Sequence, residues 1–421
     1  MSLNLLLDLV DAGKYNEAWI EIDSLEYPDT LEGEFWRIHI SWYKFHSRES
    51  IKIAEEAIDM ADNNNQPIWK LMYYLSGSIA LIILREYELA LEWIDKLEDL
   101  LDQFQDTTEY REKELEIQHM YLAIKAYVHL RGGLLDDSID LYEQAVAIGE
   151  KQASSWVGFN TIRSIGYSTL GSVYLLKGRF DDALEIFKRR LALAYEMKNL
   201  IFIWRSQQQI TEVYWKTNQY FDAYHNLQIV LAKYHDFKDT NEFIWRHKVQ
   251  SLFKLIILTL KLSKDEEAEE YYQELEKITI EHNLEDFPYT LKLSKALILK
   301  SSNKLRDKVA ALDLLIEIIN EIDKSKLYVS DGIVDDNIPM ITLLNLYDLY
   351  LWELKSTQNE DVIGDIDELS SKLIFLALSY NSLPILGEAI LLDARYNMIT
   401  ANLKYAKELY ERAISLSQEQ G

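Results

Sequence analysis

The side chains best suited to chemistry in this sequence are cations that recur at a regular spacing. Phe202-Ile203-Trp204-Arg205 is repeated as Phe243-Ile244-Trp245-Arg246, 41 residues later. Because arginine can hold a carboxylate through two charge-assisted hydrogen bonds, such a repeat can bind acidic groups. The sequence therefore predicts a partner-binding set, whose members are Arg163, Arg205, Gln208, Gln209, Arg246 and Lys248.

The same repeat also has a purely structural interpretation. Phe35-Trp36-Arg37 and Ile68-Trp69-Lys70 echo it earlier in the chain. Large aromatic side chains at helical spacing are usually core residues, and a long cationic side chain can follow the seam and end in water. In that interpretation the tryptophans fill seams between helices and the cations have no partner beyond this chain.

No other residue pattern indicates catalysis or a cofactor. The eight histidines do not include the zinc-binding helix pattern with a glutamate between paired histidines. His39 and His46 could share a helix face, but no carboxylate cluster lies near them at ligand spacing. No phosphate-binding glycine pattern and no Gly-x-Ser-x-Gly elbow occurs. Asp136-Asp137 and Asp181-Asp182 are expected to begin helices, where the dipole favours carboxylates. We therefore expect no enzyme activity, no cofactor and no metal site.

The composition indicates a helical protein with a large core. The chain has 421 residues, of which 48% are hydrophobic and only 5 are proline and 14 glycine. It contains no cysteine, which excludes disulfides and thiol catalysis and fits a reducing compartment. Met1–Val10 lacks the basic region of a signal peptide, and no apolar run approaches the ~20 residues of a membrane span. We expect a soluble, cytoplasmic protein without membrane insertion.

The net charge of −26 is distributed unevenly. Residues 1–150 carry a net charge of −19, residues 151–262 carry +7, and residues 263–421 carry −14. A basic middle in an acidic protein suggests a local site for something anionic. The alternative is that charge varies by chance among solvated helix faces.

The stretch Thr169–Leu193 predicts two antiparallel helices. Gly178 can take the left-handed conformation that closes the first helix. In the second helix, small Ala183 permits close approach and large Phe187, one turn later, fills the space above it. Gly171 in the first helix has no side chain to keep the second helix away.

These residues resemble the tetratricopeptide repeat (TPR) family, whose signature spacing they match at Gly171, Tyr174, Gly178, Phe180, Ala183 and Phe187. The late proline of that family is missing, and Arg190 replaces its second small residue. The small residue of the second helix recurs at positions 18, 54, 90, 138, 183, 223 and 268. Because such pairs bury their cores only against neighbours, the pattern predicts an all-α fold, a right-handed α-solenoid of about ten TPR-like antiparallel helix pairs.

The resemblance is clearest over residues 1–282 and degenerates after that. We expect a helical-hairpin array over residues 1–325, followed by degenerate hairpins and a cap over residues 339–421, with a polar last helix. The 326–338 loop that joins them is either a hinge or partner-contacting segment, or an ordinary surface loop.

The resemblance implies that the first helices of the pairs line a concave groove, into which Arg163, Arg205 and Arg246 project. Arg189 and Arg190 are expected on a second helix, on the convex side. We therefore expect a non-catalytic protein–protein interaction scaffold or adaptor that binds a peptide or protein segment, with acidic segments at the basic middle. The alternatives are a regulatory or sensor module that binds a small ligand or its own tail and, less favoured because the overall charge opposes it, nucleic-acid binding.

Overall fold

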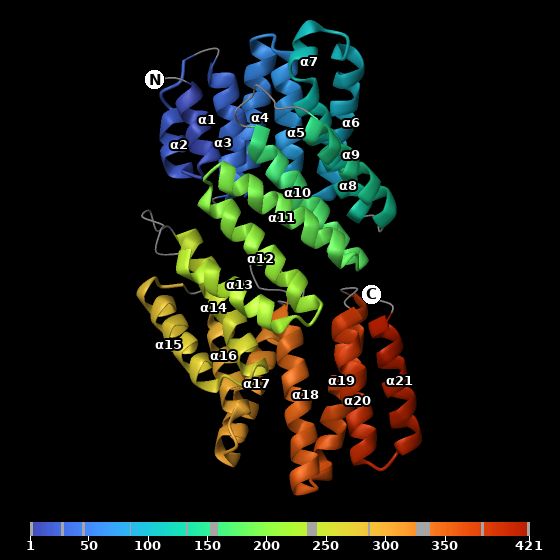
Figure 1. Cartoon of the computed structure of the whole chain (residues 1–421). Coiled ribbons are helices and arrows are strands. Elements are labelled where there is room, and N and C mark those ends of the chain that lie inside the picture. Colours follow the sequence, from blue (N-terminus) through green and yellow to red (C-terminus); the bar gives the residue numbers. More distant parts are fainter. Residues whose placement is uncertain are drawn as a thin grey trace. The chain divides into compact units, whose positions relative to one another are not determined.

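The computed structural model describes residues 3–26, 29–43, 47–84, 86–131, 134–151, 159–233, 242–284, 287–325, 337–379 and 383–418. All regular structure in these ranges is helical, without a strand, so the all-α prediction is confirmed (Figure 1). The chain forms two compact units, Met1–Val213 and Tyr214–Gly421, which are described here one at a time.

The N-terminal unit consists of consecutive helix pairs with one short extra helix, α7, before the fourth pair. Each pair packs as an antiparallel hairpin and then against the next pair, as an α-solenoid requires. Its helices are α1 (Leu3–Asp11), α2 (Tyr15–Ile22), α3 (Asp29–Tyr43), α4 (Ser47–Asn63), α5 (Pro67–Ile83), α6 (Tyr87–Phe104), α7 (Thr108–Glu112), α8 (Glu114–Arg131), α9 (Leu135–Lys151), α10 (Phe159–Lys177), α11 (Phe180–Glu196) and α12 (Leu200–Lys216), whose last three residues fall in the second unit.

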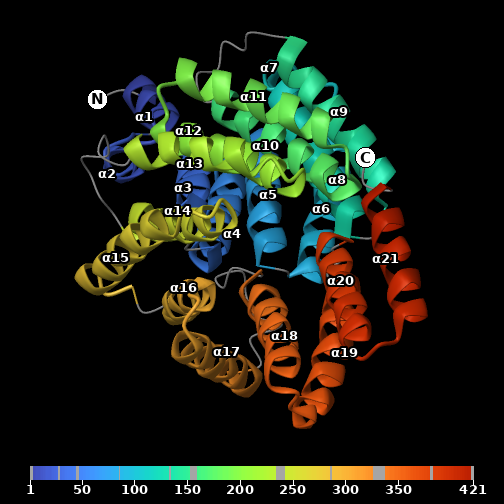
Figure 2. The same ribbon diagram turned by 60° about the horizontal axis from the view of Figure 1, so that its bottom comes forward.

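The C-terminal unit continues the same pattern to the end of the described chain (Figure 2). One core runs through α16 to α20 and includes Leu315, Tyr347, Leu373 and Ala389. Its helices are α13 (Tyr220–Lys233), α14 (Glu242–Lys261), α15 (Asp265–Glu281), α16 (Pro288–Ser301), α17 (Leu305–Ser325), α18 (Asn337–Thr357), a 3₁₀ turn at Glu360–Val362, α19 (Ile363–Ser379), α20 (Leu383–Ile399) and α21 (Leu403–Gln418).

The small residues that define the sequence period are buried on the second helices, and all but Ala54 are the fourth residue of their helix. Each is at most 1% exposed, so each lets its helix approach a neighbour closely. The period read from the sequence is therefore the structural repeat. These residues are Ala18, Ala54, Ala90, Ser138, Ala183, Ala223 and Ala268.

A glycine and an aromatic ring interlock the two helices of the fifth pair. A Cβ atom added to Gly171 of α10 would lie 2.3 Å from Cε1 of Phe187 on α11, and Phe187 is fully buried. The third pair repeats the device, because a Cβ atom on Gly77 would lie 2.2 Å from Cζ3 of Trp93. Glycine at these positions is required for the close approach of the ring.

Gly178 ends α10 with φ = 78°, as predicted from the sequence. An alanine side chain is strained at such an angle, so Gly178→Ala is expected to lower the free energy of unfolding by about 1–2 kcal/mol. Gly364→Ala is the matched control, because Gly364 lies within α19 and an added Cβ atom would meet nothing within 4 Å. Urea unfolding curves should show the control to be neutral or more stable, by up to about 1 kcal/mol; equal losses for both variants would contradict the role of the angle.

The first pair of the N-terminal unit also contacts the fifth. Thr161 Oγ1 on α10 donates a hydrogen bond of 2.9 Å to Oδ1 of Asp11 on α1. A Cβ atom on Gly13, just after α1, would lie 2.7 Å from Oδ1 of Asn199. A stack in which each pair touches only its neighbours has no such contact, so this unit closes on itself more tightly than the sequence period alone predicts.

Two expectations about the C-terminal region need separate comment. Residues 326–336 of the predicted 326–338 loop lie outside the described residues, and residues 337–338 already belong to α18. The last helix, α21, exposes the charged residues on which the predicted cap rests, among them Lys404, Lys407 and Glu411. It buries Ala406, Leu409 and Ala413, but its outer face mixes charges with apolar side chains that are 42–67% exposed, namely Leu403, Tyr405, Tyr410 and Ile414.

Within the described ranges, no helix combines the length and apolar character that crossing a bilayer requires.

Candidate functional site

The predicted partner-binding residues all lie on first helices of helix pairs, but they are divided between the two units. Four belong to the N-terminal unit and two to the C-terminal unit. They are Arg163 on α10, Arg205, Gln208 and Gln209 on α12, and Arg246 and Lys248 on α14.

Arg163 is half-buried where α10 meets α9. Its Nη1 donates to Asn160 Oδ1 at 3.2 Å and its Nη2 to the Tyr167 hydroxyl at 3.5 Å. The Tyr167 hydroxyl in turn donates to Glu150 Oε1 at 2.9 Å. The buried Nε of Arg163 has no hydrogen-bond partner. The two terminal nitrogens thus hold the guanidinium in one place.

Arg205 and Gln208 lie half-exposed on α12, next to buried aromatic residues. Trp204 is 3% exposed and Trp36, at the corresponding place in an earlier pair, is fully buried. These two tryptophans are therefore core residues, whereas Trp69 and Trp245 of the same repeat are half-buried. The burial of the tryptophans does not determine the role of the neighbouring cations Arg37 and Arg205, which depends on the contacts of those side chains.

Gln209 takes part in a buried network, and this corrects the expectation for Arg190. Arg190 is 2% exposed, not on a convex surface. Its Nε donates to Ser164 Oγ at 3.2 Å and its Nη1 to Gln209 Oε1 at 2.6 Å. Gln209 Nε2 donates to Ser168 Oγ at 2.9 Å. The long side chain at a position that the family fills with a small residue reaches inward, because α10 and α12 supply polar groups there.

The two candidates in the C-terminal unit contact that unit's own residues. Lys248 is 8% exposed, and its Nζ lies 2.6 Å from Glu274 Oε1 on α15. The Arg246 guanidinium lies 5.8 Å from the centre of the Phe287 ring, a cation–π distance. Lys248 is therefore part of a partly buried ion pair between α14 and α15.

A further cation cluster in the C-terminal unit was not predicted. On α16, Lys300 Nζ lies 2.7 Å from Asp348 Oδ2 on α18, and Arg395 Nη1 on α20 lies 2.5 Å from Asp348 Oδ1. Lys308 Nζ donates to the Lys300 carbonyl oxygen at 2.9 Å. Burial lowers the pKa of Lys300, against the attraction of Asp348. Two cations, Lys300 and Arg395, thus flank the carboxylate of Asp348 on three successive first helices, and Lys308 on the second helix α17 contacts only the Lys300 backbone.

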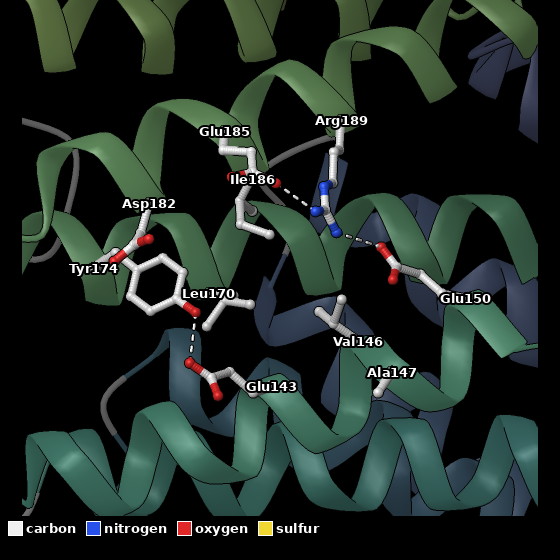
Figure 3. A pocket seen from close by; sticks show the side chains of 10 residues that line it. All are labelled: Glu143, Val146, Ala147, Glu150, Leu170, Tyr174, Asp182, Glu185, Ile186 and Arg189. Atoms are coloured by element: carbon white, nitrogen blue, oxygen red, sulfur yellow. Dashed lines mark hydrogen bonds and ion pairs between the residues drawn. The ribbon is translucent and has the colours of Figure 1, made fainter.

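The side of the N-terminal unit formed by second helices carries a hollow of about 270 Å³ where α9, α10 and α11 meet (Figure 3). Its inner surface is apolar and its rim is charged. The Tyr174 hydroxyl donates to Glu143 Oε1 at 2.6 Å, and burial together with this bond raises the pKa of Tyr174. The lining residues are Glu143, Val146, Ala147, Glu150, Leu170, Tyr174, Asp182, Glu185, Ile186 and Arg189.

Sequence reasoning missed this hollow because its carboxylates come from two helices. Asp182 was interpreted only as a helix-start residue, and it does lie in the first turn of α11, as Asp137 lies in the first turn of α9. The acidic rim arises because α9 packs beside α11, and the spacing of residues within one helix cannot predict which helices pack together.

The described residues contain no group of three or more His, Cys, Asp or Glu side chains placed to hold a metal ion. His39 is buried, its Nε2 lies 3.1 Å from Ser76 Oγ, and burial lowers its pKa to about 3. His39 is therefore a neutral core residue. His46, its proposed neighbour on a shared face, lies outside the described residues.

No family model and no curated protein sequence matches the chain. Several solved structures, however, are similar to it in fold. The apo form of the quorum sensor NprR from B. thuringiensis is 13% identical, with a TM-score of 0.60 over 93% of this chain and 100% of that chain. A Rap protein complexed with competence and sporulation factor is 12% identical, with a TM-score of 0.57 over 93% of this chain and 98% of that chain. NprR in complex with its cognate peptide NprX is 14% identical, with a TM-score of 0.52 over 94% and 100%. At these identities the likeness shows the fold: the chain is an α-solenoid built from TPR-type helix pairs.

Proposed function

We propose that this chain is a non-catalytic protein that binds a peptide or protein segment along the first helices of its pairs, as an adaptor or as a peptide-responsive regulator. The observation that carries the proposal is the polar surface of α10 and α12. There, half-exposed Arg163, Arg205 and Gln208 stand beside a buried hydrogen-bonded network.

That network favours binding because it fixes the surface before a partner arrives. Arg190, Gln209, Ser164 and Ser168 tie α10, α11 and α12 together through hydrogen bonds of 2.6–3.2 Å. A surface that is already ordered loses little conformational entropy on association, so more of the contact energy appears as affinity.

The cations favour an acidic segment. Arginine pairs with carboxylates through two parallel hydrogen bonds, and Arg163 on α10 and Arg205 on α12 are both half-exposed. In the C-terminal unit, Lys300 and Arg395 share the single carboxylate of Asp348, and the Arg395 side chain is 50% exposed. In each unit, therefore, first helices carry cations that a partner's carboxylates can reach.

The structural neighbours support peptide binding and also favour a regulatory variant of it. One is named a quorum sensor and was solved with its cognate peptide, and another is a Rap protein complexed with a competence and sporulation factor. The alternative is a module that senses a small molecule or its own tail. In that case a metabolite screen should find a small molecule that raises the melting temperature of this chain without any partner protein. Because a chain without cysteine suits a reducing compartment, we propose that binding takes place in the cytoplasm.

The test is a pull-down from native lysate with wild type and Arg205→Glu/Arg246→Glu, at moderate salt. Each substitution reverses a charge on a first helix, so partners that wild type retains are expected to be lost. Lys188→Glu/Lys404→Glu makes the same change in charge on the second helices α11 and α21 and should keep them. Equal recovery of partners by both variants, with circular dichroism showing both folded, would contradict the proposed surface.

A further inference from the structure

The hollow at the junction of α9, α10 and α11 combines an apolar floor with a rim of carboxylates (Figure 3). Leu170 is 1% exposed, Val146 7% and Ile186 8%, so the floor is part of the core surface. Its volume of about 270 Å³ lies just below the range of about 300–1,000 Å³ typical of sites for small molecules. It is therefore sized for one or two side chains of a partner and not for a cofactor.

The charges at the rim are unequal. Arg189 is shared between Glu185 and Glu150, with its Nη1 3.2 Å from Glu150 Oε1. Arg179 lies beside the hollow, with its Nε 2.6 Å from Asp182 Oδ2 and its Nη1 3.7 Å from Glu143 Oε1. Each of these two arginines therefore forms ion pairs with two carboxylates.

Two arginines thus face the four carboxylates of the rim, Glu143, Glu150, Asp182 and Glu185, which leaves two negative charges uncompensated over an apolar floor. Side-chain exposures of 37–63% keep these carboxylates within reach of a partner.

We propose that this hollow is a docking site for a protein segment that presents an arginine or lysine next to an apolar side chain. Charge complementarity selects the cation. The apolar floor selects the neighbouring side chain and the aliphatic stem of the cation, which can lie on Leu170, Val146 and the Tyr174 ring while its charged end meets the rim. The metal alternative is not supported by the geometry, because no group of ligands suited to a metal ion occurs among the described residues.

This site is separate from the cationic surface of the proposed function. It lies on the side where the second helices α9 and α11 meet, and it has the opposite charge preference. The two inferences can therefore fail independently. A chain with both would bring a basic and an acidic segment to different faces of its N-terminal unit.

The test measures the binding of a capped, fluorescently labelled peptide, Leu-Arg-Leu-Arg-Leu with Ser-Gly flanks, to the full chain by fluorescence anisotropy. Wild type is expected to bind it saturably. Glu143→Gln/Glu150→Gln keeps the hydrogen-bond acceptors but removes two charges, and should weaken binding about tenfold, which corresponds to the loss of one or two charge-assisted contacts. Asp182→Asn/Glu185→Gln should give the same loss from the α11 side, so the result does not depend on the folding of one variant.

Three controls make the result decisive. Asp95→Asn/Asp99→Asn removes two exposed carboxylates from α6 and should change the affinity less than the rim variants do. A peptide with citrulline in place of arginine should bind much more weakly, and spermidine should not displace the arginine peptide. Absence of saturable binding at millimolar peptide, equal losses in rim and α6 variants, equal binding of the citrulline peptide, or displacement by spermidine would each overturn the proposal.

Discussion

Alanine in place of Phe187 is expected to lower the free energy of unfolding of the N-terminal unit by about 3–5 kcal/mol. Phe187 is fully buried on α11, and its ring lies where a Cβ atom on Gly171 of α10 would stand. Removing the ring leaves a cavity at the centre of the fifth helix pair, which neighbouring side chains can fill only in part.

Gly171→Leu alone should also destabilise the pair, by about 1–3 kcal/mol, because the new side chain collides with the ring. In Gly171→Leu/Phe187→Ala the leucine can occupy the space left by phenylalanine, so the loss should be smaller than the sum of the single losses.

Urea unfolding of the four proteins gives the interaction energy. Phe375→Ala is the control, because Phe375 on α19 is 68% exposed and its loss should matter by no more than about 0.5 kcal/mol. A Phe187→Ala variant that is as stable as this control would refute the interlock.

The second large effect is expected at Asp11, where the first pair meets α10. Burial raises the pKa of Asp11 from its ordinary value of 3.8 to about 7, aided by Asp8 and opposed by the hydrogen bond from Thr161. The folded state therefore binds a proton that the unfolded state releases between these two values. Stability from this group is present below pH ~4 and is lost as the pH rises toward 7.

Asp11→Asn should remove this dependence, because its side-chain oxygen can still accept the bond from Thr161 but carries no charge. At pH 8 the variant is expected to be more stable than wild type by up to about 4 kcal/mol, a difference that should vanish near pH 4. Hydrogen exchange of the α1 and α10 amides at several pH values measures it. Asp95→Asn, an exposed substitution on α6, should follow wild type; parallel profiles for Asp11→Asn and wild type would contradict a buried, titrating contact.

The features that the sequence predicts well are those contained in one helix pair. Ala183, Gly171, Gly178 and Phe187 lie within one stretch, and their sizes and backbone freedom determine how two adjacent helices pack. The same local logic identified the other small residues, each of which is buried on the second helix of its pair.

The failures involve contacts between pairs. Arg190 appeared to be a surface charge because its partners, Ser164 and Gln209, are neutral and come from two other helices. The bond between Asp11 and Thr161 joins residues 150 positions apart. It depends on how far the first five pairs curve, which follows from packing angles that the repeat period does not encode. The acidic hollow is hidden from sequence for the same reason.

The most direct measurement of the central claim is hydrogen exchange on the full chain, free and bound to a segment captured in the pull-down. The account predicts slower exchange on α10 and α12, around Arg163 and Arg205–Gln208, when an acidic segment is bound. Slower exchange restricted to second helices, with α12 unchanged, would contradict binding along the first helices.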